Sequence, residues 1–325
     1  MAACTVLIAV GLLSIAFGTR RIPFSTLLQV LGGNSTQKIS IEAAAISKRI
    51  PRMFFGMIAG GALGVSGSLM QSITRNPVAD PSILGVNTGA SLFVVAGLSF
   101  FHITSPGQYI WLSILGAGAT AVFVYAIASI GTGGATPLKL ALAGTAASTA
   151  LGSLVSAIML PADTHVLNSF RFWQVGSISG ASWDKIELLA PFFIVGLALA
   201  FILSPQLNAL ALGDEMAASL GVNVKLVRVL AALSGVVLCG ATTALAGPIG
   251  FIGLMVPHTV RMIFGSDMKI MMPMSALCGA AMLLSSDVIG RLIGGVGETE
   301  VGIVTAFLGA PVFIAVVRKA KVRSL

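Results

Sequence analysis

Long apolar runs without a charged side chain constrain this chain more than any other feature of its sequence. Residues 229–260, for example, contain no Asp, Glu, Lys or Arg. In lipid every backbone N–H and C=O needs an internal partner, so only α-helices and closed β-barrels cross a membrane. Barrel strands alternate apolar and polar residues, and these runs do not alternate. The sequence therefore predicts an all-α polytopic membrane protein.

The composition supports this interpretation. The chain is 56% hydrophobic and only 9% charged, with a mean hydropathy of +0.99. Soluble domains carry roughly 25% charged residues, so we expect residues 1–325 to form a single transmembrane domain. The cysteines Cys4, Cys239 and Cys278 lie in apolar runs without metal-ligand spacing. We interpret them as small hydrophobic residues and expect no bound metal or cofactor.

About ten runs are long enough to form transmembrane helices. Residues 1–18 are similar to the core of a signal peptide, but no basic residue precedes them and no clear cleavage motif follows, so we expect a first span there. Ten spans place both termini on one side, and the basic C-terminal tail indicates the cytoplasm. The predicted spans are residues 2–18, 53–72, 85–101, 108–130, 138–160, 187–204, 226–246, 249–264, 270–290 and 300–318.

Most of the basic residues on the predicted outer side lie in one loop, residues 19–52. A basic outer loop opposes the general preference of Lys and Arg for the cytoplasmic side. The loop is either a solvated connection tolerated because other loops set the topology, or a cationic docking surface for an acidic partner outside. The residues alone leave both interpretations open.

The second predicted span carries a small residue at every fourth position, Gly56, Gly60, Gly64 and Ser68. Residues four apart lie on one face of a helix. A face of small side chains lets another helix backbone approach closely in a membrane. The spacing therefore predicts tight helix packing along this face.

No motif for nucleotide hydrolysis or metal-dependent catalysis occurs in the sequence. The chain lacks G-x-x-x-x-G-K-[ST], H-E-x-x-H and G-x-S-x-G, so we do not expect an enzyme. Ion-coupled carriers place ionisable groups inside their spans, whereas here almost all lie at span ends, with Asp287 the deepest. This disfavours a proton- or sodium-driven secondary transporter, which stays an alternative together with a membrane scaffold.

A short segment, "LALGDEMAASLGV", separates the sixth and seventh predicted spans. Asp214 suits a helix N-terminus and Gly221 suits a helix end. Met216 and Leu220 are four residues apart and share one face. A helix of about two turns is not stable alone. It needs a partner at the cytoplasmic face, either another protein or its own bundle.

A polar corner, "RNPVADPSILGVNTGA", interrupts the apolar runs between the second and third spans. Pro77 and Pro81 end helices, while Asn76 and Asp80 can bond neighbouring backbone groups. We interpret this corner first as a structural elbow on the cytoplasmic side. Its position also allows it to brace the short helix, with Arg75 as the expected contact.

Six stretches together resemble the FecCD-type permeases of ATP-binding-cassette importers for ferric siderophores, haem and cobalamin. One stretch would be weak support, but six in the family's order, covering nearly the whole chain, are specific. The stretches are "KRIPRMFFGMIAGGALGVSGSLMQ", "RNPVADPSILGVNTGA", "FWQVGSISGASW", "LALGDEMAASLGV", "GPIGFIGLMVPHTVR" and "EVGIVTAFLGAPVFIAVVRK".

The resemblance implies a type II importer permease of the bacterial cytoplasmic membrane, with both termini in the cytoplasm. The implied partners are a second permease subunit, identical or related, two cytoplasmic ATPase subunits and an external binding protein. No nucleic-acid partner is expected. The expected cargo is an iron(III)–siderophore complex moved by alternating access, and haem or cobalamin is the alternative.

The resemblance also assigns roles to individual residues. Residues 210–222 match the family's coupling helix, which docks in a groove on the ATPase. Arginines in "RIPR" and at the end of the ninth span match those that pair with glutamates of the binding protein, and Asp287, one turn earlier, could orient the last of them. Small polar residues of the fifth span match the path, although helix contact is an equal alternative for them. The expected docking residues are Arg49, Arg52 and Arg291; the coupling residues are Asp214, Glu215, Met216, Ala217, Leu220, Gly221 and Arg75; the path and gate residues are Thr136, Pro137, Ser148, Thr149, Ser153 and Ser156.

Overall fold

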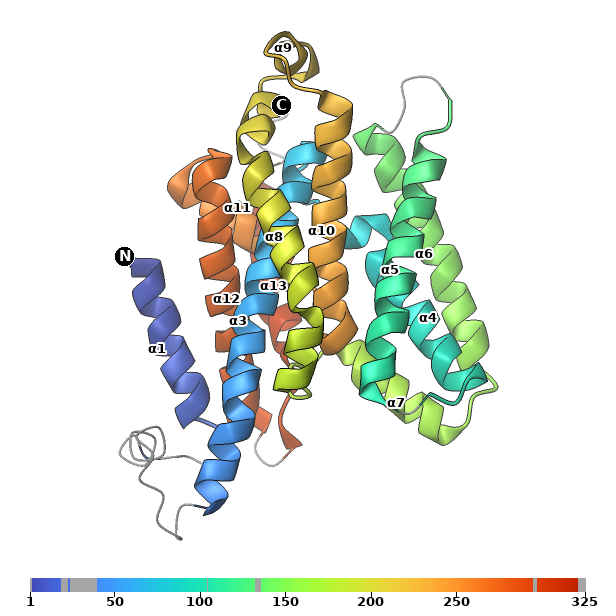
Figure 1. Ribbon diagram of the computed structural model, residues 1–325, viewed down its shortest axis with the longest axis vertical. Helices are drawn as coiled ribbons and strands as arrows, with labels where there is room; N and C mark the ends of the chain where they lie inside the picture. Colours follow the sequence, from blue (N-terminus) through green and yellow to red (C-terminus); the bar gives the residue numbers. More distant parts are fainter. Residues whose placement is uncertain are drawn as a thin grey trace.

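The computed structural model describes residues 2–18, 23, 40–103, 105–131, 136–294 and 297–320, and the regular structure in these residues is entirely helical. Figure 1 shows long helices running roughly side by side, with one short helix, α9, projecting from one end. The helices are α1 (Ala2–Ala16), α3 (Ser40–Thr74), η2 (Pro81–Leu84), α4 (Val86–Phe100), α5 (Pro106–Ala128), α6 (Pro137–Met159), α7 (Thr164–Val175), α8 (Trp183–Ala211), α9 (Asp214–Ser219), α10 (Val224–Ala246), α11 (Ile252–Phe264), α12 (Met268–Gly294) and α13 (Val301–Ala320).

The ten predicted spans all correspond to helices, and the predicted fold class is confirmed. Six helices are long and apolar enough to cross a membrane. Four shorter apolar helices, α1, α4, α11 and α13, account for the other four predictions. Helices α3 and α8 continue well beyond the apolar windows that revealed them.

The predicted loop of residues 19–52 is wrong for residues 40–52. Residues 40–52 belong to α3, because a run rich in alanine continues the helix past its apolar part. Lys48, Arg49 and Arg52 therefore lie on a helix extension. The other basic residues of this segment lie outside the described residues.

Helix α7 was not predicted, because it is too short and too amphipathic to register as a span. Its local signal is an N-cap: the Asp163 carboxylate accepts a hydrogen bond from the Val166 backbone N–H at 2.8 Å. The helix lies across the end of the bundle opposite α9 in Figure 1.

Helix α3 is the centre of the packing and contacts α1, α8, α10, α11 and α12. Its predicted stripe of small residues faces α12. A Cβ atom at Gly60 would overlap the Gly279 carbonyl oxygen, and one at Gly64 would overlap the Ser275 carbonyl oxygen. The Ser68 hydroxyl donates to the Ser275 hydroxyl at 2.9 Å. The predicted close approach is confirmed, and its partner is α12.

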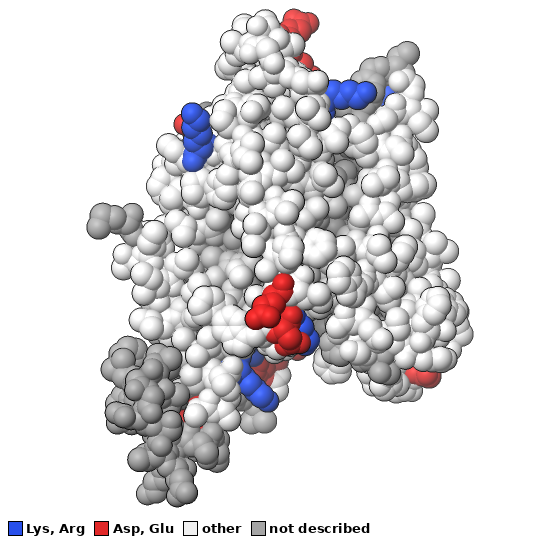
Figure 2. All heavy atoms as spheres, in the orientation of Figure 1, with Lys and Arg blue, Asp and Glu red and all other residues white. Residues whose placement is uncertain are grey.

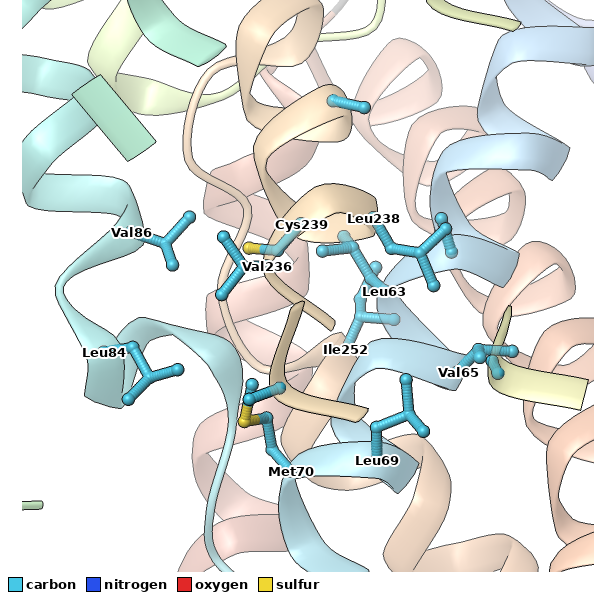
Figure 3. Packing of buried hydrophobic residues seen from close by; sticks show 14 of the residues in the cluster. Leu63, Val65, Leu69, Met70, Leu84, Val86, Val236, Leu238, Cys239 and Ile252 are labelled. Carbon is cyan, nitrogen blue, oxygen red and sulfur yellow. The ribbon is translucent and has the colours of Figure 1, made fainter. Parts of the chain in front are cut away.

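The apolar core lies where α3 meets α10 and η2. Leu63, Met70, Leu84, Val86 and Val236 belong to one buried cluster, and Figure 3 shows their side chains converging from three parts of the chain. Close packing of these side chains holds the elements together.

The polar corner enters the bundle instead of staying at its end. Ala79 and Leu84 are buried in the main core. The Asp80 carboxylate accepts from the Ser82 backbone N–H at 2.7 Å and caps η2, and the Asn76 side chain accepts from the Val78 N–H at 3.1 Å. The predicted elbow is present, and it also forms part of the interior.

Charged side chains gather toward the two ends of the face shown in Figure 2, and a band of uncharged surface separates them. Such a band is what a bilayer requires, because a charge at its centre is costly. The C-terminal ends of α3, α5 and α8 lie at the same end of the bundle as α9 in Figure 1.

Candidate functional site

Helix α9 projects from the bundle as a helix of six residues between two glycines (Figure 1). Gly213 and Gly221 both have positive φ angles, +114° and +82°, which glycine adopts without the steric cost that a Cβ atom brings. The Val222 N–H donates back to the Ala217 carbonyl at 3.0 Å and closes the helix end. The chain therefore leaves the bundle, forms this short helix and re-enters at α10.

Two arginines, one directly after α3 and one in α10, hold the start of α9. Asp214 forms an ion pair with Arg75, at the end of α3, and a second one of 2.9 Å with Arg228 of α10. The Arg75 guanidinium also donates to the Leu210 carbonyl at 3.0 Å. The contact predicted for Arg75 is present, and it ties the polar corner to α9.

The outward face of α9 is apolar and uncovered. Met216 and Leu220 are 55% and 61% exposed, whereas Ala217 between them is fully buried against the bundle. The two long side chains therefore do not rest on the bundle of their own chain. An exposed apolar pair on an anchored helix is typical of a surface that another protein covers.

A cluster of four charged residues occupies the opposite end of α3 and α12. Arg52 donates to Asp287 at 2.7 and 3.1 Å and to Glu298 at 2.7 Å. Asp287 is 2% exposed, and Glu298 is 31% exposed. The Arg52 guanidinium therefore bridges a buried carboxylate and a partly accessible one.

Arg291 lies inside this cluster and not at the surface. Its side chain is 2% exposed and forms an ion pair of 2.7 Å with Asp287, as the i, i+4 spacing predicted. It also donates to the carbonyls of Ser14 and Phe17 at 2.8 and 2.9 Å, at the end of α1. In this conformation Arg291 acts within the chain, and a docking role for it stays a prediction.

Arg49 also reaches α1, through a hydrogen bond of 2.8 Å from its guanidinium to the Ile15 carbonyl. The three predicted docking arginines thus converge on one region, where they tie α1, α3 and α12 together. The internal pairing of Arg52 with Glu298 was not predicted, because the two residues lie far apart in the sequence.

Helix α6 presents a polar face to the outside of the chain. Thr149, Ser153 and Ser156 are exposed, and each hydroxyl donates at 3.0 Å to a backbone carbonyl one turn earlier. Ser148 differs, because it is half-buried beside Gly85. Only 17% of the apolar window of α6 is buried within this chain. Contact with helices of the same chain is therefore not what orders the three exposed residues.

The predicted gate residues begin α6. Thr136 is its N-cap, and its hydroxyl accepts from the Lys139 N–H at 3.3 Å. Pro137 is the first residue of the helix, where proline needs no backbone N–H. Both residues lie at the α9 end of the bundle (Figure 1), and their place at the inner mouth and a gating role stay predictions.

Comparisons with known proteins identify similar chains along nearly the whole sequence. A family model described as the FecCD transport family matches residues 6–319. The Fe(3+)-citrate import system permease protein YfmD of Bacillus subtilis is 44% identical over 84% of this chain and 80% of its own length. The ferric enterobactin transport system permease protein FepD of Escherichia coli is 40% identical over 96% and 92%.

A solved structure resembles the fold closely. It is described as an inward-facing conformation of a metal-chelate type ABC transporter, and it superposes with a TM-score of 0.83 at 28% identity. The match covers 98% of this chain and 97% of the other.

Proposed function

The chain belongs to the FecCD transport family, and from this membership we propose that it carries an iron(III)–siderophore complex across the cytoplasmic membrane by alternating access. It is a membrane permease of the ATP-binding-cassette importer type, which does not itself catalyse a reaction. The choice of cargo follows the relatives YfmD and FepD, which are named for ferric citrate and ferric enterobactin. Haem or cobalamin is the alternative.

The geometry of α9 carries the proposal. A helix that is anchored by two arginines and offers two exposed apolar side chains fits a groove on a cytoplasmic ATPase subunit. Two such ATPases would serve two permeases, either identical or related. The proposed orientation places α9, both termini and the mouth of α6 in the cytoplasm.

A chain of contacts connects α9 to the interior. Arg75 joins α9 to the polar corner, the corner continues into η2 and Gly85, and Gly85 lies beside Ser148 of α6. Movement of α9 by the ATPase would therefore be transmitted to the α6 face through residues 75–85. This arrangement gives alternating access a physical route.

The opposite end is the proposed docking region for the external binding protein. Arg49 and Arg52 supply positive charge there, and Glu298 occupies the accessible side of Arg52. A carboxylate of the binding protein would compete with Glu298 for the Arg52 guanidinium. Arg291 would contribute through Asp287, which it shares with Arg52.

Two alternatives from other classes have distinct signatures. A secondary transporter would retain uptake without the ATPase and lose it with an uncoupler. A membrane scaffold would form no ATPase cross-link through residues 214–221. An ABC permease should lose uptake without the ATPase, retain it with an uncoupler, and form an ATPase cross-link through residues 214–221.

The decisive experiment is uptake by vesicles that hold the permease, its ATPase and its binding protein. We expect the double substitution Met216→Glu and Leu220→Glu to lower ATP-driven uptake by more than about tenfold, because two apolar anchors become charged. Leu160→Glu, at an 89% exposed position at the other end of α6, is the matched control. Equal uptake by the double variant and the control would contradict the role of α9.

A further inference from the structure

A pocket with one polar wall opens between α4, α6 and α7. It has a volume of about 540 Å³, which lies in the range of small-molecule sites. Helix α4 contributes Asn87, Thr88 and Ser91, and α7 contributes Arg171 and Gln174. The exposed α6 hydroxyl of Ser156 completes this polar wall. Polar groups converging between membrane helices are costly unless they serve a ligand path.

Among the described residues, the lining of this pocket carries positive charge and no negative charge. Arg171 is the only charged residue among the described residues that line it. Its side chain is exposed, and within the described part of the chain it forms no ion pair. Asp163, the nearest acidic residue in sequence, caps the start of α7 and does not line the pocket. An uncompensated guanidinium in a concave site favours an anion.

The side-chain amide of Asn87, which lines this pocket, is held at its oxygen atom. Its Oδ1 atom accepts from the Thr243 hydroxyl at 3.0 Å, and the Cys239 Sγ atom lies 3.7 Å from the same oxygen. Both contacts occupy the acceptor end of the side chain. Within the part of the chain that the structure describes, the Nδ2 atom of Asn87 donates no hydrogen bond, so its two N–H groups can serve a ligand in the pocket that Asn87 lines.

We propose that this pocket holds a negatively charged ferric chelate in transit, with Arg171 pairing with its anionic groups and Asn87 and Gln174 donating hydrogen bonds. The inference rests on the proposed function and adds a preference for anionic over neutral cargo. A single exposed guanidinium binds weakly enough to release the chelate onward, because solvent screens such a pair.

Equilibrium binding of labelled chelates to the full-length permease in phosphatidylcholine nanodiscs tests the proposal. The probes are ferric citrate, which is anionic, and a neutral ferric trihydroxamate. A zwitterionic bilayer removes anionic lipid headgroups as competitors for Arg171. Three variants are compared with the wild type: Arg171→Gln, Arg171→Lys and, as a control, Lys48→Gln, which removes an exposed positive charge of α3 outside the pocket.

We expect Arg171→Gln to weaken ferric citrate binding about tenfold and to leave the neutral chelate unchanged. Arg171→Lys keeps the charge and should recover most of the affinity, and Lys48→Gln should bind as the wild type does. Unchanged ferric citrate binding in Arg171→Gln, equal losses for both chelates, or no ferric citrate binding by the wild type would each overturn the proposal.

The binding test needs neither ATP nor partner proteins, so it is separable from the proposed function. Charge-selective binding without ATP-driven uptake would reject the importer role and keep the pocket. Uptake without charge-selective binding would support the importer role and reject the proposed pocket. Because Arg171 is exposed, Arg171→Gln should unfold at the wild-type temperature, and that measurement excludes a folding defect.

Discussion

At the scale of single residues, Asp287 is held by two arginines in a buried position. Its carboxylate pairs with both Arg52 and Arg291 while only 2% of the side chain is exposed. The sequence predicted the Arg291 pair, because the two residues lie one helical turn apart. It did not predict the Arg52 pair, because that contact depends on how α3 and α12 pack.

Replacement of Asp287 by Asn should destabilise the fold by about 3 kcal/mol, because two arginines lose their shared buried carboxylate. Glu298→Gln is the control: its side chain is partly exposed, and the expected loss is less than about 1 kcal/mol. Thermal unfolding in one detergent measures both variants. Similar unfolding temperatures for the two would show that burial does not strengthen the Asp287 pairs.

Asp267 should give a measurable dependence of stability on pH. Hydrogen bonds from the Asn208 amide at 2.7 Å and from the Lys269 backbone N–H at 2.9 Å lower the pKa of Asp267 below 3.8. A group with a lowered pKa in the folded state stabilises the protein fully above its unfolded pKa, and this contribution disappears as pH falls through the folded pKa.

Asp267→Asn should therefore unfold at a lower temperature than the wild type at pH 6, with the gap closing toward pH 3 and below. Unfolding temperatures over this pH range provide the measurement, and Glu187→Gln, at an exposed position of α8, is the control. A gap that stays constant across the range would refute the assigned hydrogen bonds.

At the scale of helices, hydropathy located all ten predicted helices because each contains an apolar window, although only six of them are long enough to cross a membrane. It missed α7 and the first turns of α3, because those segments lie beyond the apolar windows. The small-residue stripe predicted a tight contact from Gly60 and Gly64, but the identity of α12 as the partner required the structure. Periodicity describes one helix at a time and carries no information on its neighbour.

The contact between α3 and α12 should depend on the missing side chain at Gly60. Gly60→Ala places a methyl group against the Gly279 carbonyl oxygen, which is backbone and cannot rotate away. We expect a loss of about 1–3 kcal/mol in unfolding free energy. Gly118→Ala is the matched control, because nothing lies within 4 Å of a Cβ atom there.

Alanine at the unobstructed position should be neutral or stabilise α5 by roughly 0.5–1 kcal/mol, since glycine weakens a helix interior. Chemical unfolding of both variants gives the comparison. Equal destabilisation by Gly60→Ala and Gly118→Ala would mean that glycine flexibility, and not close approach, explains the stripe.

At the scale of the whole molecule, α6 is the least covered of the six long spans. The hydroxyls of Thr149 and Ser153 are exposed, the hydroxyl of Ser156 borders the pocket between α4, α6 and α7, and Ser148 is half-buried beside Gly85 at the polar corner. The sequence identified these residues as small and polar but left their direction open. A second permease facing α6 would enclose this surface as a water-filled path.

Cysteine accessibility tests that arrangement. In a background with Cys4, Cys239 and Cys278 replaced by Ala, Thr149→Cys and Ser153→Cys should react with a membrane-impermeant charged thiol reagent in the assembled transporter. Val122→Cys, 70% exposed on the apolar surface of α5, should react at least about tenfold more slowly because lipid excludes the thiolate. Equal rates at all three positions would argue against a path along α6.

The double attachment of Asp214 limits how this protein can move. One of its arginine partners, Arg75, directly follows α3, and the other, Arg228, belongs to α10, so α9 cannot be displaced relative to both elements without a change at one of the two ion pairs. Either both helices travel together as one rigid body, or one ion pair must open during every transport cycle. Which pair opens would then set the height of the barrier between the two orientations of the transporter.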